Sequence, residues 1–231
     1  MTRQWYLEEE RKKEQEHDRT RTELQNLKNQ LNPHFLFNVM NNIYSSIGTD
    51  SGKARKLMDS LCELLRYVLY RSEKPTVAFK EEVSFIRDYI ELVKNRMPED
   101  SVLSVSIPDE PSDTPVAPML FIPLVENAFK HGVRPGGNSH LDICVSEHDG
   151  RMLCRVENSL YEDAEGCGKG GGIGMENLRK RLEIMYSGRY ILSYGAAAEG
   201  RYRAYLEIDT FVGQKYEKGK SGQSGRQSSK I

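Results

Sequence analysis

Residues 31–44 read Leu-Asn-Pro-His-Phe-Leu-Phe-Asn-Val-Met-Asn-Asn-Ile-Tyr, and this stretch decides how the rest of the chain is interpreted. Projected at about 100° per residue, it continues as a helix with one apolar stripe. The stripe consists of Leu36, Met40, Ile43 and Ile47. His34, Asn38 and Asn41 fall on nearly the opposite face, so burial of the stripe would leave His34 in water. Pro33 should kink the helix beside His34. We expect an imidazole presented to another domain, although a plain surface histidine would fit the same spacing.

A helical hairpin is predicted for residues 1–73. The first helix is expected to run from near Trp5 to near Ile47, with leucines at coiled-coil spacing before the proline. Residues 48–52 form a turn, and a second amphipathic helix follows up to about Ser72. One hairpin buries its apolar stripe poorly, so pairing of two hairpins into a four-helix bundle predicts a homodimer. The alternative is a monomeric hairpin packed on the following domain.

The pattern changes after the hairpin, and residues 74–212 are predicted to form a second domain. Its expected elements are a helix over 79–97, a strand over 102–107, a helix over 119–131, a strand hairpin over 141–145 and 152–156, a helix over 175–185, and strands over 190–194 and 203–208. This order with antiparallel strand pairs predicts an α+β sandwich with helices on one face. Residues 213–231 are rich in Gly, Ser, Lys and Gln and are expected to be a disordered tail.

Residues 123–132 read Pro-Leu-Val-Glu-Asn-Ala-Phe-Lys-His-Gly and carry a second polar constellation. On a helix, Asn127, Lys130 and His131 share one face. An amide oxygen of Asn127 suits Mg²⁺, and Lys130 and His131 suit phosphate. The pattern therefore fits a metal-bound triphosphate. The alternative is a solvated helix end, where Lys and His suit the helix dipole.

Six glycines precede the last predicted helix, among them Gly170, Gly172 and Gly174. Glycines let backbone N–H groups approach a phosphate closely, and the helix that contains Asn177 adds a positive N-terminus. Neither a six-residue G-x-G-x-x-G string nor a Walker-type Gly-Lys-Ser/Thr is present. A flexible linker is the alternative reading of this segment.

These motifs together resemble the LytS/YesM-type sensor histidine kinases. The string from Asn32 to Asn38 resembles their phosphoacceptor box, and residues 123–132 resemble the Asn-containing box of the ATPase domain. That domain has the Bergerat-type fold shared with DNA gyrase and MutL. The glycine-rich segment resembles the ATP lid and the box after it. The resemblance covers roughly Leu24 to Ile208.

The resemblance implies a catalytic mechanism and a set of ligands. ATP would bind with Mg²⁺ held by Asn127, and His34 would take the γ-phosphoryl group and pass it to an aspartate of a response regulator. Asn38 would orient the imidazole or hold a water. Asn158 stands where the family usually has the adenine-binding aspartate, and Asp163 is a second candidate.

Two departures from the wider kinase pattern leave alternatives open. Phe35 stands where many histidine kinases have an acidic residue, and Pro123 stands where gyrase-type ATPases have a catalytic glutamate. The altered motif at Asn158 allows a non-catalytic dimeric scaffold with a degenerate nucleotide domain. A gyrase- or MutL-like ATPase is a further alternative, against which Pro123 argues.

Composition narrows the setting of the protein. The formal net charge of the 231 residues is −1, which does not suggest a nucleic-acid partner. Four cysteines without a Cys-x-x-Cys pair favour a reducing compartment, so a cytoplasmic chain is expected. No run has the length of a membrane helix. An upstream sensor or membrane domain, if one exists, would lie outside this sequence.

Overall fold

Two helices joined by a short turn form the N-terminal part of the described chain, as predicted. The computed structural model describes residues 33–136, 138–161 and 173–210. Helix α2 spans Pro33–Ile47 and helix α3 spans Ser51–Tyr70. Asp50 caps α3, because its carboxylate accepts a hydrogen bond of 2.9 Å from the backbone N–H of Lys53. The predicted helix before Pro33, the kink there and the predicted tail lie outside the described residues.

The buried face of α2 differs from the predicted stripe. Ile43 is buried as expected, but the second fully buried position is Val39. Met40 and Ile47 are 58% and 59% exposed, so their predicted burial is wrong. The reason is that α2 itself carries apolar side chains on more than one side. The helical periodicity of its sequence therefore did not identify which of these sides packs on α3.

Helix α4, Phe79–Lys94, packs along α3 and begins the second domain. Its predicted apolar face is confirmed as buried: Val83, Ile86, Tyr89, Ile90 and Val93. The two helices run antiparallel, because Lys56 pairs with Glu91 at one end (3.2 Å) and Arg71 with Glu81 at the other (3.1 Å). The hairpin thus packs on the following domain, the arrangement of the monomeric alternative. Homodimerisation through a four-helix bundle stays a prediction.

Glu82, at the start of α4, is a fully buried carboxylate that joins three segments. It accepts hydrogen bonds from the Tyr67 hydroxyl on α3 and from the backbone N–H groups of Met119, at 2.5 Å, and Leu120, at 3.3 Å. Burial raises its pKa, and these hydrogen bonds oppose that shift. A side chain of the domain junction therefore fixes both α3 and the segment that leads into the next helix.

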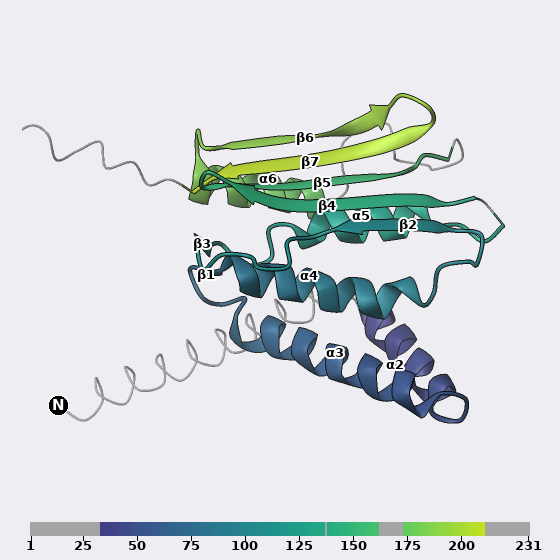
Figure 1. Cartoon of the computed structure of the whole chain (residues 1–231). Helices are drawn as coiled ribbons and strands as arrows, with labels where there is room; N and C mark the ends of the chain where they lie inside the picture. The colour runs from purple at the N-terminus through teal and green to yellow at the C-terminus, as the bar shows by residue number, and fades with distance from the viewer. Residues whose placement is uncertain (1–32, 137, 162–172, 211–231) are drawn as a thin grey trace, which may run out of the picture.

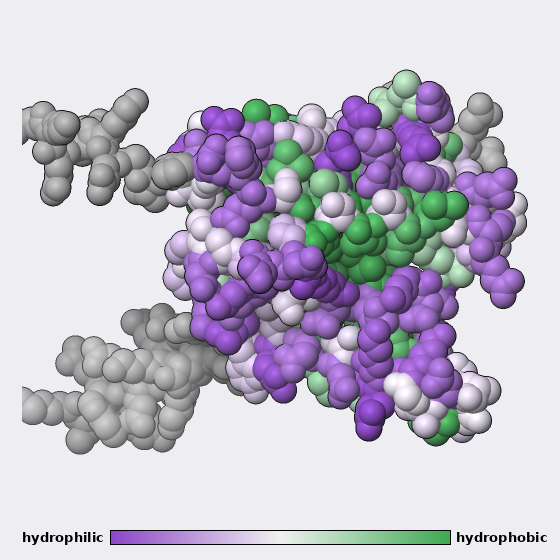
Figure 2. All heavy atoms as spheres, in the orientation of Figure 1, coloured by the Kyte–Doolittle hydropathy of each residue, from purple (hydrophilic) through white to green (hydrophobic). Residues whose placement is uncertain are grey.

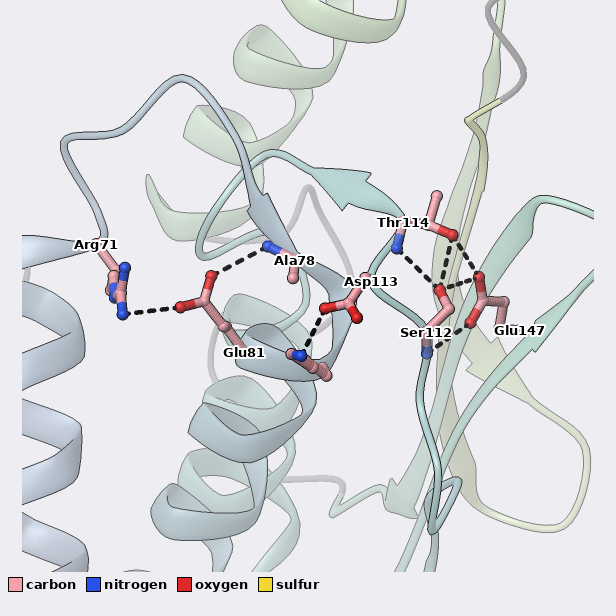
Figure 3. A network of polar contacts seen from close by, with 8 residues as sticks. Arg71, Ala78, Glu81, Ser112, Asp113, Thr114 and Glu147 are labelled. Carbon is pink, nitrogen blue, oxygen red and sulfur yellow. Dashed lines mark hydrogen bonds and ion pairs between the residues drawn. The ribbon is translucent and has the colours of Figure 1, made fainter.

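Figure 3 shows further polar contacts on the same side of the molecule. Glu81 joins Arg71 of α3 to the backbone N–H of Ala78. Farther along, Glu147 accepts hydrogen bonds from the hydroxyls of Ser112, at 2.5 Å, and Thr114, at 3.0 Å. These contacts hold the loop between β2 (Val102–Ser106) and β3 (Pro115–Val116) against strand β4 (His140–His148) of the sheet.

The main sheet has the order β2-β4-β5-β7-β6. Its strands are β2 (Val102–Ser106), β4 (His140–His148), β5 (Arg151–Ser159), β6 (Tyr190–Ala197) and β7 (Arg201–Asp209). All neighbours are antiparallel except β2 and β4, which are parallel. The expectation of antiparallel pairs alone was wrong here, because helix α5 (Ile122–Gly132) crosses between these two strands. A two-stranded sheet of β1 (Val77–Ala78) and β3 (Pro115–Val116) was not predicted.

The helices lie on one face of the main sheet, so the predicted α+β fold class is confirmed. Figure 1 shows the sheet above, α5 and α6 (Ile173–Tyr186) beneath it, α4 as the next layer, and α2 and α3 farthest from the sheet. Alternate residues of the strands form the sheet side of the core: Leu141, Ile143, Met152, Cys154, Val156, Leu206 and Ile208. In the part of the chain that the structure describes, none of the helices combines the length and the apolar character needed to cross a membrane.

Candidate functional site

A cleft of about 610 Å³ opens where α2, the C-terminal end of α4 and α5 meet. Among the described residues that line it are His34 from α2, Arg96 from the turn after α4, and Glu126, Asn127 and Lys130 from α5. Three of them, His34, Asn127 and Lys130, are residues that the sequence singled out in motifs about 90 positions apart. The fold brings these motifs into one cavity.

His34 lies at the exposed side of α2, as expected from the sequence. The side-chain amide nitrogen of Asn38 is 3.1 Å from Nδ1 and 3.3 Å from Nε2 of the His34 imidazole. The two residues are one helical turn apart, which is the spacing that lets side chains meet on a helix. Asn38 therefore contacts the imidazole directly and restricts its orientation.

A row of aromatic rings anchors His34 over the second domain. Phe35 stacks on Tyr89 of α4, with ring centroids 5.3 Å apart, and Tyr89 meets Phe129 of α5 edge-on at 6.2 Å. Such ring pairs contribute about 0.5–1.5 kcal/mol beyond the area they bury. Phe35 thus packs α2 against α4, and Tyr89 of α4 links this stack to Phe129 of α5.

Helix α5 contributes three polar side chains to the lining of the cleft: Glu126, Asn127 and, one turn later, Lys130. Pro123 stands in its first turn, where a missing N–H is harmless, so the helix begins at Ile122 rather than at Met119. Glu126 was not predicted as a site residue. Its side chain is exposed at the cleft, but desolvation by the surrounding protein raises the pKa of its carboxyl group, and the charge of Lys130 lowers this pKa. His131 is exposed but does not line the cleft; partial burial and Lys130 lower its pKa.

Asn158 lies apart from these residues, near the end of β5. It is buried, does not line the cleft, and donates a hydrogen bond of 2.8 Å from its side-chain nitrogen to the backbone oxygen of Ser159. A Cβ at Gly132 would lie only 2.5 Å from the Cβ of Asn158, so glycine is required where α5 ends against the strand. The structure therefore places Asn158 beside α5 but not beside His34.

The glycine-rich segment is described only in part. Gly170, Gly172 and Asp163 lie outside the described residues. Gly174 lines the main cleft, and Gly174 and Asn177 line an adjoining cavity of about 210 Å³ that also reaches Glu126. Within the described ranges, no group of three His, Cys, Asp or Glu side chains is arranged to hold a metal ion. A metal ion at this site would therefore be coordinated by Asn127 and by oxygen atoms of a bound phosphate ligand.

Comparison with known proteins identifies the family. Residues 22–101 match the sequence model of the family described as histidine kinase. The chain belongs to the histidine kinase family. It is 32% identical over 175 residues to the sensor histidine kinase YpdA of Escherichia coli, an alignment that covers 72% of this chain and 31% of that protein.

The sensor histidine kinase/phosphatase LytS of Staphylococcus aureus is a second relative of this histidine kinase. It is 29% identical over 191 residues, which cover 77% of this chain and 33% of LytS. The chain therefore spans about a third of the length of these curated relatives. The histidine kinase domain of a blue-light activated kinase from Erythrobacter litoralis is similar at 13% identity and a TM-score of 0.45, over 74% of this chain and 82% of that one. The LytS-type resemblance predicted from the sequence is confirmed by the two sequence relatives.

The side chains of the cleft suit a nucleoside triphosphate. Its volume lies in the range of small-molecule sites, about 300–1,000 Å³. Arg96 and Lys130 supply positive charge, and the amide of Asn127 offers one oxygen to a cation that phosphate oxygens would otherwise surround. ATP with Mg²⁺ therefore fits the chemistry of the residues present. Mg²⁺, when bound, would neutralise phosphate charge.

Proposed function

We propose that this histidine kinase segment transfers the γ-phosphoryl group of ATP to His34 and then to an aspartate of a response regulator. The observation that carries this proposal is the shared cleft: His34 of α2 faces Asn127 and Lys130 of α5. Membership of the histidine kinase family supports the same reaction. A non-catalytic scaffold would not need an imidazole beside a cationic, triphosphate-sized cavity, so the kinase reading is favoured.

The transfer step follows from the position of His34. One nitrogen of the neutral imidazole donates its lone pair to the γ-phosphorus, while the bond from phosphorus to the bridging oxygen breaks and ADP leaves with that electron pair. The other ring nitrogen then releases its proton to solvent at the open side of the cleft. Asn38 fixes the ring, and Phe35 keeps His34 over α5. Lys130 stabilises phosphate charge, and positioning and charge together supply most of the catalysis in such reactions.

The remaining nucleotide contacts extend the proposal beyond the cleft. We assign Mg²⁺ to Asn127, and phosphate contacts to Gly174 and Asn177 near the N-terminus of α6, with Gly170 and Gly172 as predicted additions. Asn158 would bind the adenine amino group through its amide oxygen, since it is buried beside the end of α5. His131 does not line the cleft, so it would reach a phosphate only after a change of side-chain position.

Homodimerisation is supported by an exposed apolar face on α2. Phe37, Met40, Tyr44 and Ile47 all lie on one side of the helix, away from α3, and all are exposed. Their spacing of three and four residues is that of a helix-packing seam. We propose that a second copy covers this face and that the response regulator docks near His34. The cytoplasm, which holds ATP, is the expected location, and any sensor or membrane part would lie outside this sequence.

Phosphorylation with γ-labelled ATP and Mg²⁺ tests the proposed function. The wild-type chain should acquire label that is stable in base and labile in acid, the behaviour of a phosphohistidine. His34→Gln should abolish the label while leaving ATP binding intact, and Asn127→Ala should abolish label and Mg²⁺-dependent ATP binding together. His140→Gln, at the start of β4, is the matched control and should be labelled like the wild type. A wild-type chain that binds ATP but acquires no label would favour the scaffold, and label retained on His34→Gln would refute the acceptor.

A further inference from the structure

Arg96 lies in the cleft, and neither the motifs of the sequence nor the family resemblance assigned it a role. It follows α4 directly, in a backbone that two successive turns hold in place. The N–H of Arg96 donates to the Val93 carbonyl at 3.0 Å, and the N–H of Met97 donates to the Lys94 carbonyl at 3.1 Å. Met97 and Pro98 also line the cleft, so the whole turn forms one of its walls. The position of the Arg96 backbone relative to α4 is therefore well defined.

The guanidinium of Arg96 has no carboxylate partner among residues 33–136, 138–161 and 173–210. Other arginines in this part of the chain do have one, for example Arg71 with Glu81 and Arg203 with Glu157. Lys94, two residues before Arg96, pairs with Glu91 at 2.6 Å and does not line the cleft. Arg96 thus contributes a positive charge to the cavity that no ion pair with a described residue neutralises.

Arg96 also lies within electrostatic range of the ring that anchors the acceptor helix. Burial raises the pKa of the Tyr89 hydroxyl, Glu126 raises it further, and Arg96 lowers it. Both Arg96 and Glu126 therefore act on Tyr89, whose ring stacks on Phe35 beside His34. Arg96 in the turn after α4 and Lys130 on α5 supply the two cationic groups among the side chains that line the cleft with His34.

We propose that Arg96 binds the γ-phosphate of ATP and stabilises it during transfer to His34. This inference rests on the proposed kinase function and deepens it. A planar guanidinium donates two parallel hydrogen bonds to phosphate oxygens and stays charged at every physiological pH. During transfer, charge spreads over the three equatorial oxygens of the phosphoryl group, and a nearby arginine stabilises that distribution. Because Arg96 lies in the turn that follows α4, the helix that packs on α3, the γ-phosphate contact would come from the junction between the two domains.

The test compares Arg96→Ala and Arg96→Lys with Arg55→Ala, an exposed arginine of α3 outside the cleft, as the matched control. Affinities for ATP and ADP, both with Mg²⁺, are measured alongside the rate of His34 labelling. Arg96→Ala should bind ADP within about twofold of the wild type and ATP several-fold more weakly, and should label His34 about 100-fold more slowly, the usual loss for one transition-state donor. Arg96→Lys should recover part of the rate, because lysine restores the positive charge but not the two parallel hydrogen bonds of the guanidinium.

Two results would overturn the inference. One is a labelling rate for Arg96→Ala equal to that of Arg55→Ala. The other is an equal loss of ATP and ADP affinity, which would indicate a structural role or a contact to the inner phosphates. If the wild-type chain fails to label His34, the proposed function fails, but the ratio of ATP to ADP affinity still decides whether Arg96 holds the γ-phosphate. Circular dichroism of each variant separates these outcomes from misfolding.

Discussion

The hairpin of α2 and α3 contacts the rest of the described chain, the predicted second domain, in two regions with different chemistry. Along α3 and α4 the contact is long and contains buried and partly buried polar pairs, among them Tyr67 with Glu82 and Ser60 with Asp88. At α2 the contact with the second domain includes the apolar ring stack of Phe35 on Tyr89. We therefore expect the helix that carries His34 to be held to this domain more weakly than α3 is.

This difference suggests how the kinase separates stability from catalysis. The α3–α4 contact fixes the hairpin to the domain, because removal of either buried partner would leave polar groups without hydrogen bonds. The α2 contact can open at lower cost, because separated rings lose only packing. Opening of the α2 contact would move His34 out of the cleft while α3 stays in place, and this would expose the imidazole to the proposed response regulator.

The largest effect is expected from breaking the α3–α4 contact at Glu82. Glu82→Ala leaves the Tyr67 hydroxyl and the N–H groups of Met119 and Leu120 without their acceptor. Each buried polar group that loses its partner costs about 1–3 kcal/mol, so the free energy of unfolding should fall by about 3 kcal/mol or more. Urea unfolding measures this. Glu63→Ala, which removes an exposed pair with Arg66, is the control and should change stability by less than about 1 kcal/mol. Equal effects of the two variants would refute a structural role for Glu82.

A smaller effect on stability, but a clear one on activity, is expected at Phe35. Phe35→Leu keeps an apolar side chain and removes the stack on Tyr89. The free energy of unfolding should fall by only about 1 kcal/mol. His34 labelling should slow by about tenfold with ATP affinity unchanged, because misplaced reacting groups lose rate rather than binding. Tyr70→Leu, an exposed ring at the end of α3, is the control. Labelling of Phe35→Leu at the rate of Tyr70→Leu would show that the stack does not position His34.

The smallest effect is a pH dependence of the α3–α4 contact. Burial raises the pKa of Asp88 to about 6. The hydrogen bond with the Ser60 hydroxyl lowers this pKa, and the charges of Glu63 and Glu91 raise it. Lys56 pairs with Glu91 at the same interface. Because the pKa of Asp88 in the folded state exceeds its unfolded value of about 3.9, the folded state binds the proton more tightly. Its contribution to stability is present at low pH and is lost as pH rises through 6.

Unfolding measured between pH 4 and pH 7 tests this sign. The stability of Asp88→Asn relative to the wild type should increase as pH rises across this window, because the amide never ionises. Asp59→Asn, an exposed neighbour on α3, should follow the pH profile of the wild type. A constant difference between Asp88→Asn and the wild type across the window would contradict a raised pKa at Asp88.

The elements that the sequence predicted well are those with strong local patterns. Helix α4 and the hairpin of β4 and β5 were predicted because their buried residues recur at periods of 3.6 and 2. The β1–β3 pair escaped prediction because two residues carry no periodicity. The buried side of α2 and the parallel pairing of β2 depend on contacts made only after folding, so local patterns did not determine them.

The candidate site shows the same division. His34, Asn127 and Lys130 stand in motifs with recognisable chemistry, and the structure brings them to one cleft. Arg96 and Glu126 were missed because they come to line the cleft with His34 only after folding, and neither stands in a recognisable motif of its own. The one available signal was position: Arg96 closely follows an amphipathic helix, and Glu126 directly precedes Asn127. Asn158 was predicted for the same ligand, yet it lies beside α5 rather than in the cleft.

The most direct test of the account is complementation between two inactive chains. His34→Gln, which keeps the nucleotide site, and Asn127→Ala, which keeps the acceptor, are co-expressed with different tags, and mixed assemblies are isolated through both tags. Because His34 and Asn127 of one chain line one cleft, the mixed assemblies should acquire no label from γ-labelled ATP, while tagged wild type does. Label on the Asn127→Ala chain would show that His34 is phosphorylated from the partner's nucleotide site, and would contradict the cleft as the site of transfer.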